Sequence, residues 1–229
     1  MAYDKRISLD PRLTLIAEMA GSCGCCADIG SDHGRLGAFM LQNAYCEHVV
    51  FTDISAPSLE KAKRLTALLG LSDRADFCVG DGARALNRRV DVAVIAGMGG
   101  ETISSIIQNA QGHLDGARLL LQPNVAAPQL RAALNRGGWR ISREALARDG
   151  RRIYPIIEAV EGCQALNEAE LEVGPTLLCE KPPLLRDYAR FHIRIAEKAL
   201  SGALRGDDAA SISALERTLE IWKDVEKWL

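Results

Sequence analysis

The sequence predicts an α/β protein: a mostly parallel β-sheet with an antiparallel edge, followed by a C-terminal helical hairpin. Three observations support this fold class. Short and almost wholly apolar runs alternate with stretches long enough for helices, a pattern typical of a parallel sheet covered on both faces. Two longer strand-like runs then flank an Asp-Gly pair, which favours a β-hairpin. The last segment repeats its apolar residues at spacings of three and four, as helices do.

The alternating elements occupy the first part of the chain. Asp10 can cap a helix that begins at Pro11, because its side chain can accept a backbone hydrogen bond and proline is favoured in a first helical turn. We then expect strands at 25–30, 48–54, 75–81, 90–97 and 117–124, with helices within 35–44, 58–70, 101–110 and 128–138.

The antiparallel edge is expected over residues 139–162. This segment places Asp149-Gly150 between two strand-like runs, where the pair can form a tight turn. Pro155 lies inside the second run and has no backbone N–H to donate to a ladder. We therefore expect Pro155 at a sheet edge or at a bulge.

The C-terminal part is expected to be helical. Residues 163–183 have the composition of a connection, and residues 184–229 predict two antiparallel helices separated near 201–210. The sequence thus predicts a sheet domain over residues 1–162, and a connection with a helical hairpin over 163–229.

Composition excludes several classes of protein. The chain has 229 residues, is 48% hydrophobic and carries a formal net charge of −2. It has no apolar run of about 18 residues and its N-terminus is polar, so we expect no membrane span and no secretory signal. A wholly basic nucleic-acid-binding surface is also not expected from this charge. A cytoplasmic location fits best.

The seven cysteines are an odd count, which favours reduced thiols over a disulfide framework. Cys23 and Cys26 have a CxxC spacing that occurs in metal sites and redox pairs. A structural zinc site needs four ligands, and no second pair follows, so no metal is expected. Small residues of a buried strand are the favoured interpretation, with a dithiol or metal role as the alternative.

The turn after the first expected strand has the sequence Asp28-Ile29-Gly30-Ser31-Asp32-His33-Gly34. Its small residues allow a ligand to approach the backbone closely. Asp32 stands where dinucleotide-binding turns have a glycine, and its carboxylate would repel a pyrophosphate. The same carboxylate could instead attract an ammonium or sulfonium group. His33 is either a general base or a residue that fixes the loop.

Acidic residues also end the next two strands. Asp53 follows Gly30 by 23 residues, a position from which a carboxylate can accept hydrogen bonds from ribose hydroxyls. Asp81-Gly82 follows the third strand and could accept from an adenine amine. Together these strand ends predict a nucleoside cofactor without phosphates, S-adenosylmethionine, and hence a methyltransferase.

The fourth strand ends in Gly97-Met98-Gly99-Gly100, where missing side chains leave room for a reacting base. Gln122 and Asn124 end the fifth strand and could bind a base edge or cap a loop. Asp32 could stabilise a base that becomes cationic on methylation. The candidate catalytic residues are Asp32, His33, Gly97 and Met98.

The blocks ADIGSDHGRLG, VAVIAGMGGETI, LLLQPN and DGRRIY resemble the TrmK family of bacterial tRNA (adenine-N1)-methyltransferases, which modify adenosine 22. The resemblance implies a class I, Rossmann-like methyltransferase domain with a C-terminal coiled coil. Two positions depart from the family pattern: Arg35 replaces an aromatic residue, and Asp53 replaces a frequent glutamate. The cofactor site implied is Asp28, Gly30, Ser31, Asp32, His33 and Gly34, then Asp53 and Ile54, then Asp81 and Gly82, then Gly97, Met98, Gly99 and Gly100.

A tRNA substrate requires cationic contacts to phosphate. Seven arginines fall within 131–152, whereas residues 166–229 carry nine basic and twelve acidic groups, so the positive surface is expected to be local. Two rivals remain: a non-catalytic RNA-binding or assembly protein, and a methyltransferase of another substrate. A monomer or weak homodimer is expected. The candidate tRNA contacts are Lys5, Arg6, Arg12, Arg35, Gln122, Asn124, Arg131 and Arg151.

Overall fold

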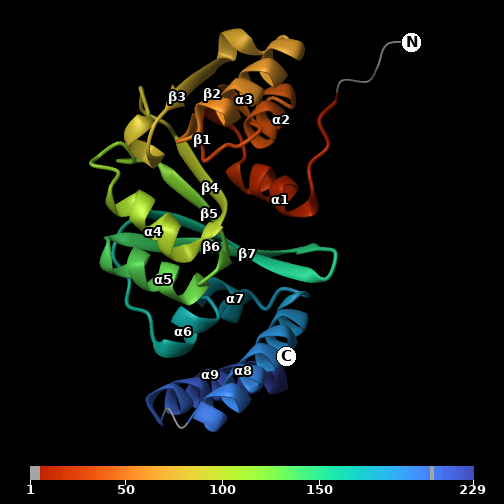
Figure 1. Cartoon of the computed structure of the whole chain (residues 1–229), viewed down its shortest axis with the longest axis vertical. Coiled ribbons are helices and arrows are strands. Elements are labelled where there is room, and N and C mark those ends of the chain that lie inside the picture. Colours follow the sequence, from red (N-terminus) through yellow and green to blue (C-terminus); the bar gives the residue numbers. More distant parts are fainter. Residues whose placement is uncertain (1–5, 207–208) are drawn as a thin grey trace.

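The computed structural model describes residues 6–206 and 209–229, and the candidate Lys5 lies outside these ranges. Its centre is a seven-stranded sheet in the order β3-β2-β1-β4-β5-β7-β6 (Figure 1). The first five strands of that order are parallel, and β7 is antiparallel to both of its neighbours. The strands are β1 (Cys23–Ile29), β2 (Cys46–Asp53), β3 (Ala75–Val79), β4 (Val92–Gly99), β5 (Arg118–Val125), β6 (Trp139–Asp149) and β7 (Arg152–Glu161).

Helices cover both faces of the parallel part, as the near-continuous apolar strands predict. On one face, Ile16, Met40 and Leu59 from three helices share a core with Phe51 of β2. On the other face, Ile103 and Leu130 share a core with Ile29. Asp10 caps the first helix by accepting the Leu13 N–H, as expected. The helices are α1 (Pro11–Ala20), α2 (Arg35–Gln42), α3 (Ala56–Leu68), α4 (Gly100–Gln108) and α5 (Ala127–Arg136), with short 3₁₀ turns at Ser72–Arg74 and Gly82–Ala85.

The β6–β7 hairpin turns after Asp149, and Gly150 adopts a φ of +56°. β7 lies between β5 and β6, so it is not an edge strand along its whole length. β5 pairs only with Ile157–Ala159, whereas Pro155 lies opposite Leu146 of β6. Pro155 therefore occupies a part of β7 where only one neighbour is paired, which accommodates its missing donor.

The expectation of a simple connection over 163–183 is wrong, because the segment forms α6 (Glu168–Glu172) and α7 (Pro175–Glu180). Asn167 begins α6 with a reciprocal capping box to Glu170. Helices this short depend on caps and packing rather than on an apolar period, which explains why the pattern did not predict them.

The long C-terminal helices are α8 (Leu185–Gly206) and α9 (Ala209–Trp228). The α8 helix continues through most of the expected break at 201–210. Leu177, Tyr188 and Trp222 form a third core together with Leu146 and Ile153 of the β6–β7 hairpin. The C-terminal helices thus share a core with the edge of the sheet, and the division at residue 162 stays a prediction.

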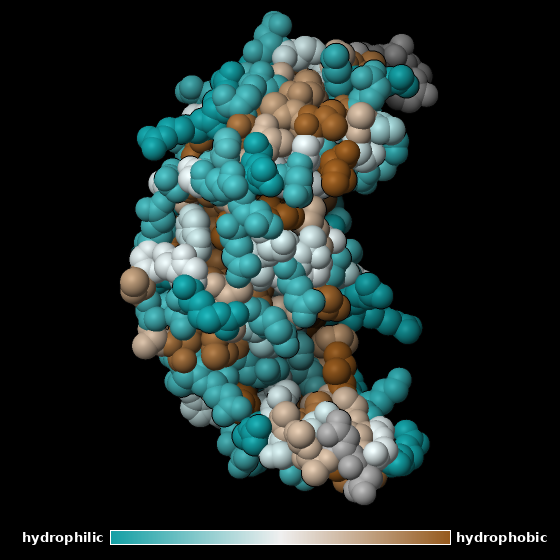
Figure 2. Space-filling model, turned by 60° about the vertical axis from the view of Figure 1, so that its left-hand side comes forward, coloured by the Kyte–Doolittle hydropathy of each residue, from teal (hydrophilic) through white to brown (hydrophobic). Residues whose placement is uncertain are grey.

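On the face shown in Figure 2, hydrophilic side chains predominate and hydrophobic ones form small groups, since most apolar residues are in the cores. Within residues 6–206 and 209–229, no helix is long and apolar enough to cross a membrane. The same residues contain no group of three or more His, Cys, Asp or Glu arranged to hold a metal ion.

Candidate active site

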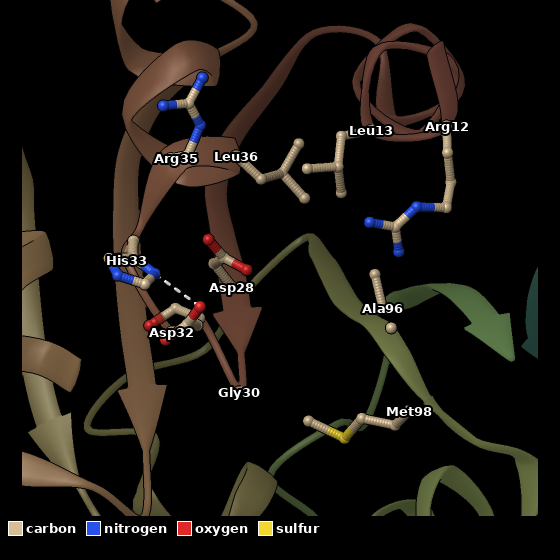
Figure 3. Close-up of a pocket in the computed structure, with 12 residues that line it drawn as sticks. Arg12, Leu13, Asp28, Gly30, Asp32, His33, Arg35, Leu36, Ala96 and Met98 are labelled. Carbon is tan, nitrogen blue, oxygen red and sulfur yellow. Dashed lines mark hydrogen bonds and ion pairs between the residues drawn. The ribbon is translucent and has the colours of Figure 1, made fainter. Parts of the chain in front are cut away.

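A pocket of about 330 Å³ opens at the carboxyl ends of β1 and β4 (Figure 3). In parallel sheets this is where ligands bind, next to the point where the strand order reverses. Four segments contribute to the wall: the start of α1, the end of β1 with its turn, the start of α2, and the end of β4. The lining residues are Arg12, Leu13, Asp28, Gly30, Ser31, Asp32, His33, Arg35, Leu36, Ala96, Gly97 and Met98.

The end of β1 and its turn present the carboxylates of Asp28 and Asp32 and the Ser31 hydroxyl to this pocket. Asp28 is only 7% exposed, and its Oδ2 accepts the Gly37 N–H at 3.0 Å. Ser31 Oγ is buried and has no hydrogen-bond partner among the described residues. Gly30 has a φ of +70°, and a Cβ there would overlap the Met98 Cε, so the glycine lets Met98 extend across from β4 (Figure 3). The turn therefore keeps polar atoms available for a ligand.

Burial raises the pKa of Asp28 to about 7; the Gly37 N–H opposes this rise and the Asp53 charge adds to it. The unfolded-state pKa is about 3.9. Because the folded state disfavours the Asp28 anion, the contribution of Asp28 to the free energy of unfolding is complete below about pH 4 and is lost as pH rises to about 7. We expect Asp28→Asn to remove this loss, so that the variant gains up to about 4 kcal/mol over wild type between pH 4 and pH 8.

Urea denaturation of the cofactor-free protein across this pH range measures the effect. Asp73→Asn is the matched control, because Asp73 is exposed on a 3₁₀ turn. If the stability of wild type and of Asp28→Asn changed with pH in parallel, the raised pKa of Asp28 would be contradicted.

Asp53, at the end of β2, ties the β1 turn to the start of α3. Its Oδ2 accepts the Asp32 N–H at 3.0 Å, and its Oδ1 accepts the Ser55 N–H at 2.8 Å. Each oxygen of a carboxylate can accept more than one hydrogen bond, so both retain capacity for a ligand hydroxyl. Asp53 does not line the pocket, but it holds Asp32, which does.

His33 is engaged on both ring nitrogens. Its Nδ1 lies 2.6 Å from Asp32 Oδ2 (Figure 3). Its Nε2 lies 3.3 Å from Lys61 Nζ. These contacts match a tautomer that donates from Nδ1 and accepts at Nε2. Since the accepting nitrogen faces Lys61, the geometry favours the loop-fixing interpretation of His33 over the general base. Lys61 itself was not among the expected site residues.

The β4 side of the pocket is built around the backbone of Gly97. Gly97 lies at a register shift between β4 and β5 and has a φ of +79°, which favours glycine. Its N–H donates to Gln122 Oε1 at 3.1 Å, and its carbonyl accepts from Asn124 Nδ2 at 2.7 Å. The side-chain amides of Gln122 and Asn124, at the end of β5, thus hold the β4 backbone in place. Gln122 is fully buried, so its predicted role as a substrate contact becomes one of positioning.

Arg12 joins the site from α1. Its guanidinium donates to Gln122 Oε1 and lies 5.6 Å from the centre of the Tyr154 ring. Arg12 was expected to contact tRNA through phosphate, but its side chain is 19% exposed and belongs to the pocket wall. Sequence reasoning also missed Tyr154, although this residue closes the DGRRIY block.

Three of the expected contact residues are buried in the structure. Gly34 and Gly100 are buried; a Cβ would crowd Ala62 in the first case and overlap the Ala126 carbonyl in the second. Their small size serves packing at these two positions. Arg131 is fully buried and pairs with Glu144 at 2.8 Å, so it cannot meet tRNA.

Apart from Arg35, which lines the pocket, the remaining expected residues lie outside the pocket wall. Ile54 is 78% exposed just after β2, and Asp81 is exposed after β3, with Gly82 accepting from Thr52 Oγ1 at 3.3 Å. Gly99 begins α4. Arg6, Arg35 and Arg151 are exposed, with Arg35 donating to the Ser8 carbonyl.

A protein-family model described as a methyltransferase domain matches residues 9–157. The tRNA (adenine(22)-N(1))-methyltransferase of Bacillus subtilis strain 168 is 30% identical over 183 residues, which are 76% of this chain and 77% of that protein. A solved structure of an uncharacterized protein from Listeria monocytogenes is 28% identical and superposes with a TM-score of 0.88, covering 95% of this chain and 99% of that one. The B. subtilis M1A22 tRNA methyltransferase TrmK, at 24% identity, shares the fold with a TM-score of 0.87 over 96% of this chain and 99% of its own. The chain belongs to the TrmK family of tRNA (adenine-N1)-methyltransferases.

Proposed function

We propose that this protein transfers a methyl group from S-adenosylmethionine to N1 of adenosine 22 in tRNA. One observation carries the proposal. The pocket places acidic and unpartnered polar groups of the β1 turn opposite a glycine backbone that two amides hold in position. A cationic nucleoside cofactor and a planar base are the ligands that such a pair of walls fits best.

The residues present fit S-adenosylmethionine. Asp32, and Asp28 in its ionised form, supply negative charge toward a sulfonium or ammonium group, and the orphaned Ser31 Oγ can donate or accept one hydrogen bond. Asp53 supplies acceptors for ribose hydroxyls. When bound, the cofactor supplies an electrophilic methyl group on a cationic sulfur.

The chain's own contribution to the reaction is chiefly positioning. Adenine N1 already carries a lone pair in the ring plane, so no deprotonation is needed before attack. The Gly97 carbonyl has a second lone pair that can accept from the N6 amine, and Asn124 fixes that carbonyl. Part of the pocket wall is apolar and keeps water away from the reacting atoms. This part consists of Met98, Leu13 and Leu36.

Charge develops on the base as N1 becomes methylated. Asp32 lies in the same pocket, and its carboxylate can stabilise the resulting cation. A proton from N6 can later pass to a carboxylate or to water. His33 keeps Asp32 in place through the 2.6 Å contact.

The tRNA must present its adenosine with the base extruded, because N1 lies on the Watson–Crick edge. We propose that exposed cations, Arg35 from α2 and Arg151 from the hairpin tip, contact phosphates, with Arg6 as a further contact; Lys5 lies outside the described residues. We further propose that the protein works in the cytoplasm as a monomer or weak homodimer.

Methylation of unmodified tRNA tests the function. A methylated N1 cannot pair, so we expect reverse transcriptase to stop next to position 22 only after incubation with both protein and S-adenosylmethionine. Substituting position 22 with guanosine in the transcript should remove the stop. Cofactor binding without any stop would support a methyltransferase of another substrate, and tRNA binding without cofactor binding would support the non-catalytic rival; either result overturns the proposal.

A further inference from the structure

A second pocket lies between the carboxyl end of β5, the strand β7 and the helix α8. Its volume is about 280 Å³, and Asn124, Val125, Ile153, Phe191, His192 and Ile195 are among the residues that line it. In Figure 1 the β6–β7 hairpin projects beyond the sheet above the start of α8, and an ion pair between Arg148 and Asp187 joins the two elements. This pocket therefore lies where the sheet meets the C-terminal helices.

One side chain links the second pocket to the active site. Asn124 lines it, and the Asn124 amide donates to the Gly97 carbonyl at 2.7 Å. Gly97 in turn lines the first pocket. A polymer that places one residue against Gly97 can thus reach this pocket with a neighbouring residue.

The chemistry of the lining is mainly apolar, with a polar edge. His192 stacks on Trp222 with ring centres 4.4 Å apart and meets Phe191 edge-on at 5.4 Å. Burial, with a smaller effect of Arg131, lowers the pKa of His192 to about 4, so the neutral ring offers one donor and one acceptor. No hydrogen bond within the described residues uses either ring nitrogen of His192. These nitrogens and the Asn124 amide can meet the hydrogen-bonding edge of a planar ligand.

Apolar side chains at the rim are left uncovered. Val125 is 67% exposed and Ile195 is 49% exposed. Two exposed cations, Arg152 and Arg194, directly precede the lining residues Ile153 and Ile195, and neither makes an ion pair within the described residues. An apolar lining with a polar edge complements a nucleobase, and the exposed cations Arg152 and Arg194 lie on the same two elements, β7 and α8, as lining residues of the pocket.

We propose that this second pocket binds an unpaired nucleobase of the tRNA next to the target adenosine, with its edge toward His192 and Asn124. The inference rests on the proposed function and names a subsite for its substrate. The volume supports a single base, because it lies just below the range of about 300–1,000 Å³ that larger ligands occupy. Holding the neighbour here would keep the adenosine extruded toward Gly97.

A filling substitution tests the subsite. Ile195→Trp should occupy the pocket from its rim and raise both Kd and KM for tRNA at least about fivefold, since base stacking contributes about that much or more. Cofactor affinity, measured by calorimetry, should stay unchanged. Leu204→Trp is the matched control, because Leu204 is a 60% exposed residue of α8 outside the pocket. An unchanged tRNA affinity for Ile195→Trp, or an equal loss for both variants, overturns the inference.

Abasic tRNAs identify the occupant. We expect removal of one base beside adenosine 22 to weaken binding to wild type at least about fivefold and to have no further effect on Ile195→Trp. If the effects of Ile195→Trp and of each abasic position are fully additive, the pocket binds no base and the inference is overturned. If Ile195→Trp changes the oligomeric state and leaves tRNA binding unchanged, the pocket instead binds a second copy of the chain. If the wild type binds tRNA with this pattern but never methylates it, the proposed function fails and the subsite stands.

Discussion

Asp53→Ala should weaken binding of the nucleoside cofactor by at least about a hundredfold. The variant loses two hydrogen bonds from ribose hydroxyls to the carboxylate, and each contributes about 1.5–3 kcal/mol to the binding free energy. The structure adds a second cause. Asp53 accepts the N–H groups of Asp32 and Ser55 at 3.0 and 2.8 Å, so its removal also frees the β1 turn that lines the pocket.

Calorimetric titration with S-adenosylmethionine measures this effect. Asp53→Glu provides a rescue, since it keeps the charge and should retain affinity within about tenfold. Asp73→Ala is the control for a lost surface carboxylate and should bind as wild type does. Cofactor binding by Asp53→Ala within threefold of wild type would show that this carboxylate holds neither the ribose nor the turn.

The parallel sheet was predictable because strands buried on both faces are apolar almost throughout. The expected strand at 25–30 is Cys23–Ile29, and the one at 117–124 is Arg118–Val125. The location of the pocket followed from the same topology, since all parallel strands end at one edge of the sheet. Asp28, Ser31 and Gly97 were found in this way.

The rest of the site depends on contacts between segments distant in sequence. Arg12 reaches the pocket because α1 packs beside β5, a contact across more than 100 positions that no local pattern encodes. Tyr154 lies beneath Arg12 only because β7 enters the sheet next to β5. Lys61 meets His33 through the packing of α3. Residue type alone could not separate these from ordinary surface groups.

The arginines of 131–152 illustrate the same limit. They were treated as one basic surface, yet Arg131 is fully buried whereas Arg136, on the same helix, is exposed. The difference depends on α6 and α7, which the sequence pattern did not predict. Arg131 Nη1 donates to the carbonyls of Leu171 and Glu172 at 3.1 and 2.9 Å, at the end of α6.

This burial leads to a second large expected effect. Arg131→Met should lower the free energy of unfolding by about 3–5 kcal/mol, because it leaves the carboxylate of Glu144 buried without its cation. Among the residues that the structure describes, the carboxylate would keep the Thr176 N–H and hydroxyl as its donors, at 3.2 and 3.3 Å. Arg136→Met on the same helix should cost less than about 0.5 kcal/mol.

The double variant separates charge from packing. Glu144→Gln combined with Arg131→Met removes the stranded charge while an amide oxygen can still accept from Thr176, so we expect it to recover at least about half of the lost stability. Urea denaturation gives the three free energies. If Arg131→Met instead left stability unchanged and weakened tRNA binding, the residue would be a substrate contact. The geometry favours the opposite outcome, in which Arg131 ties α5 to β6 and α6 and thereby secures the C-terminal helices beside the sheet.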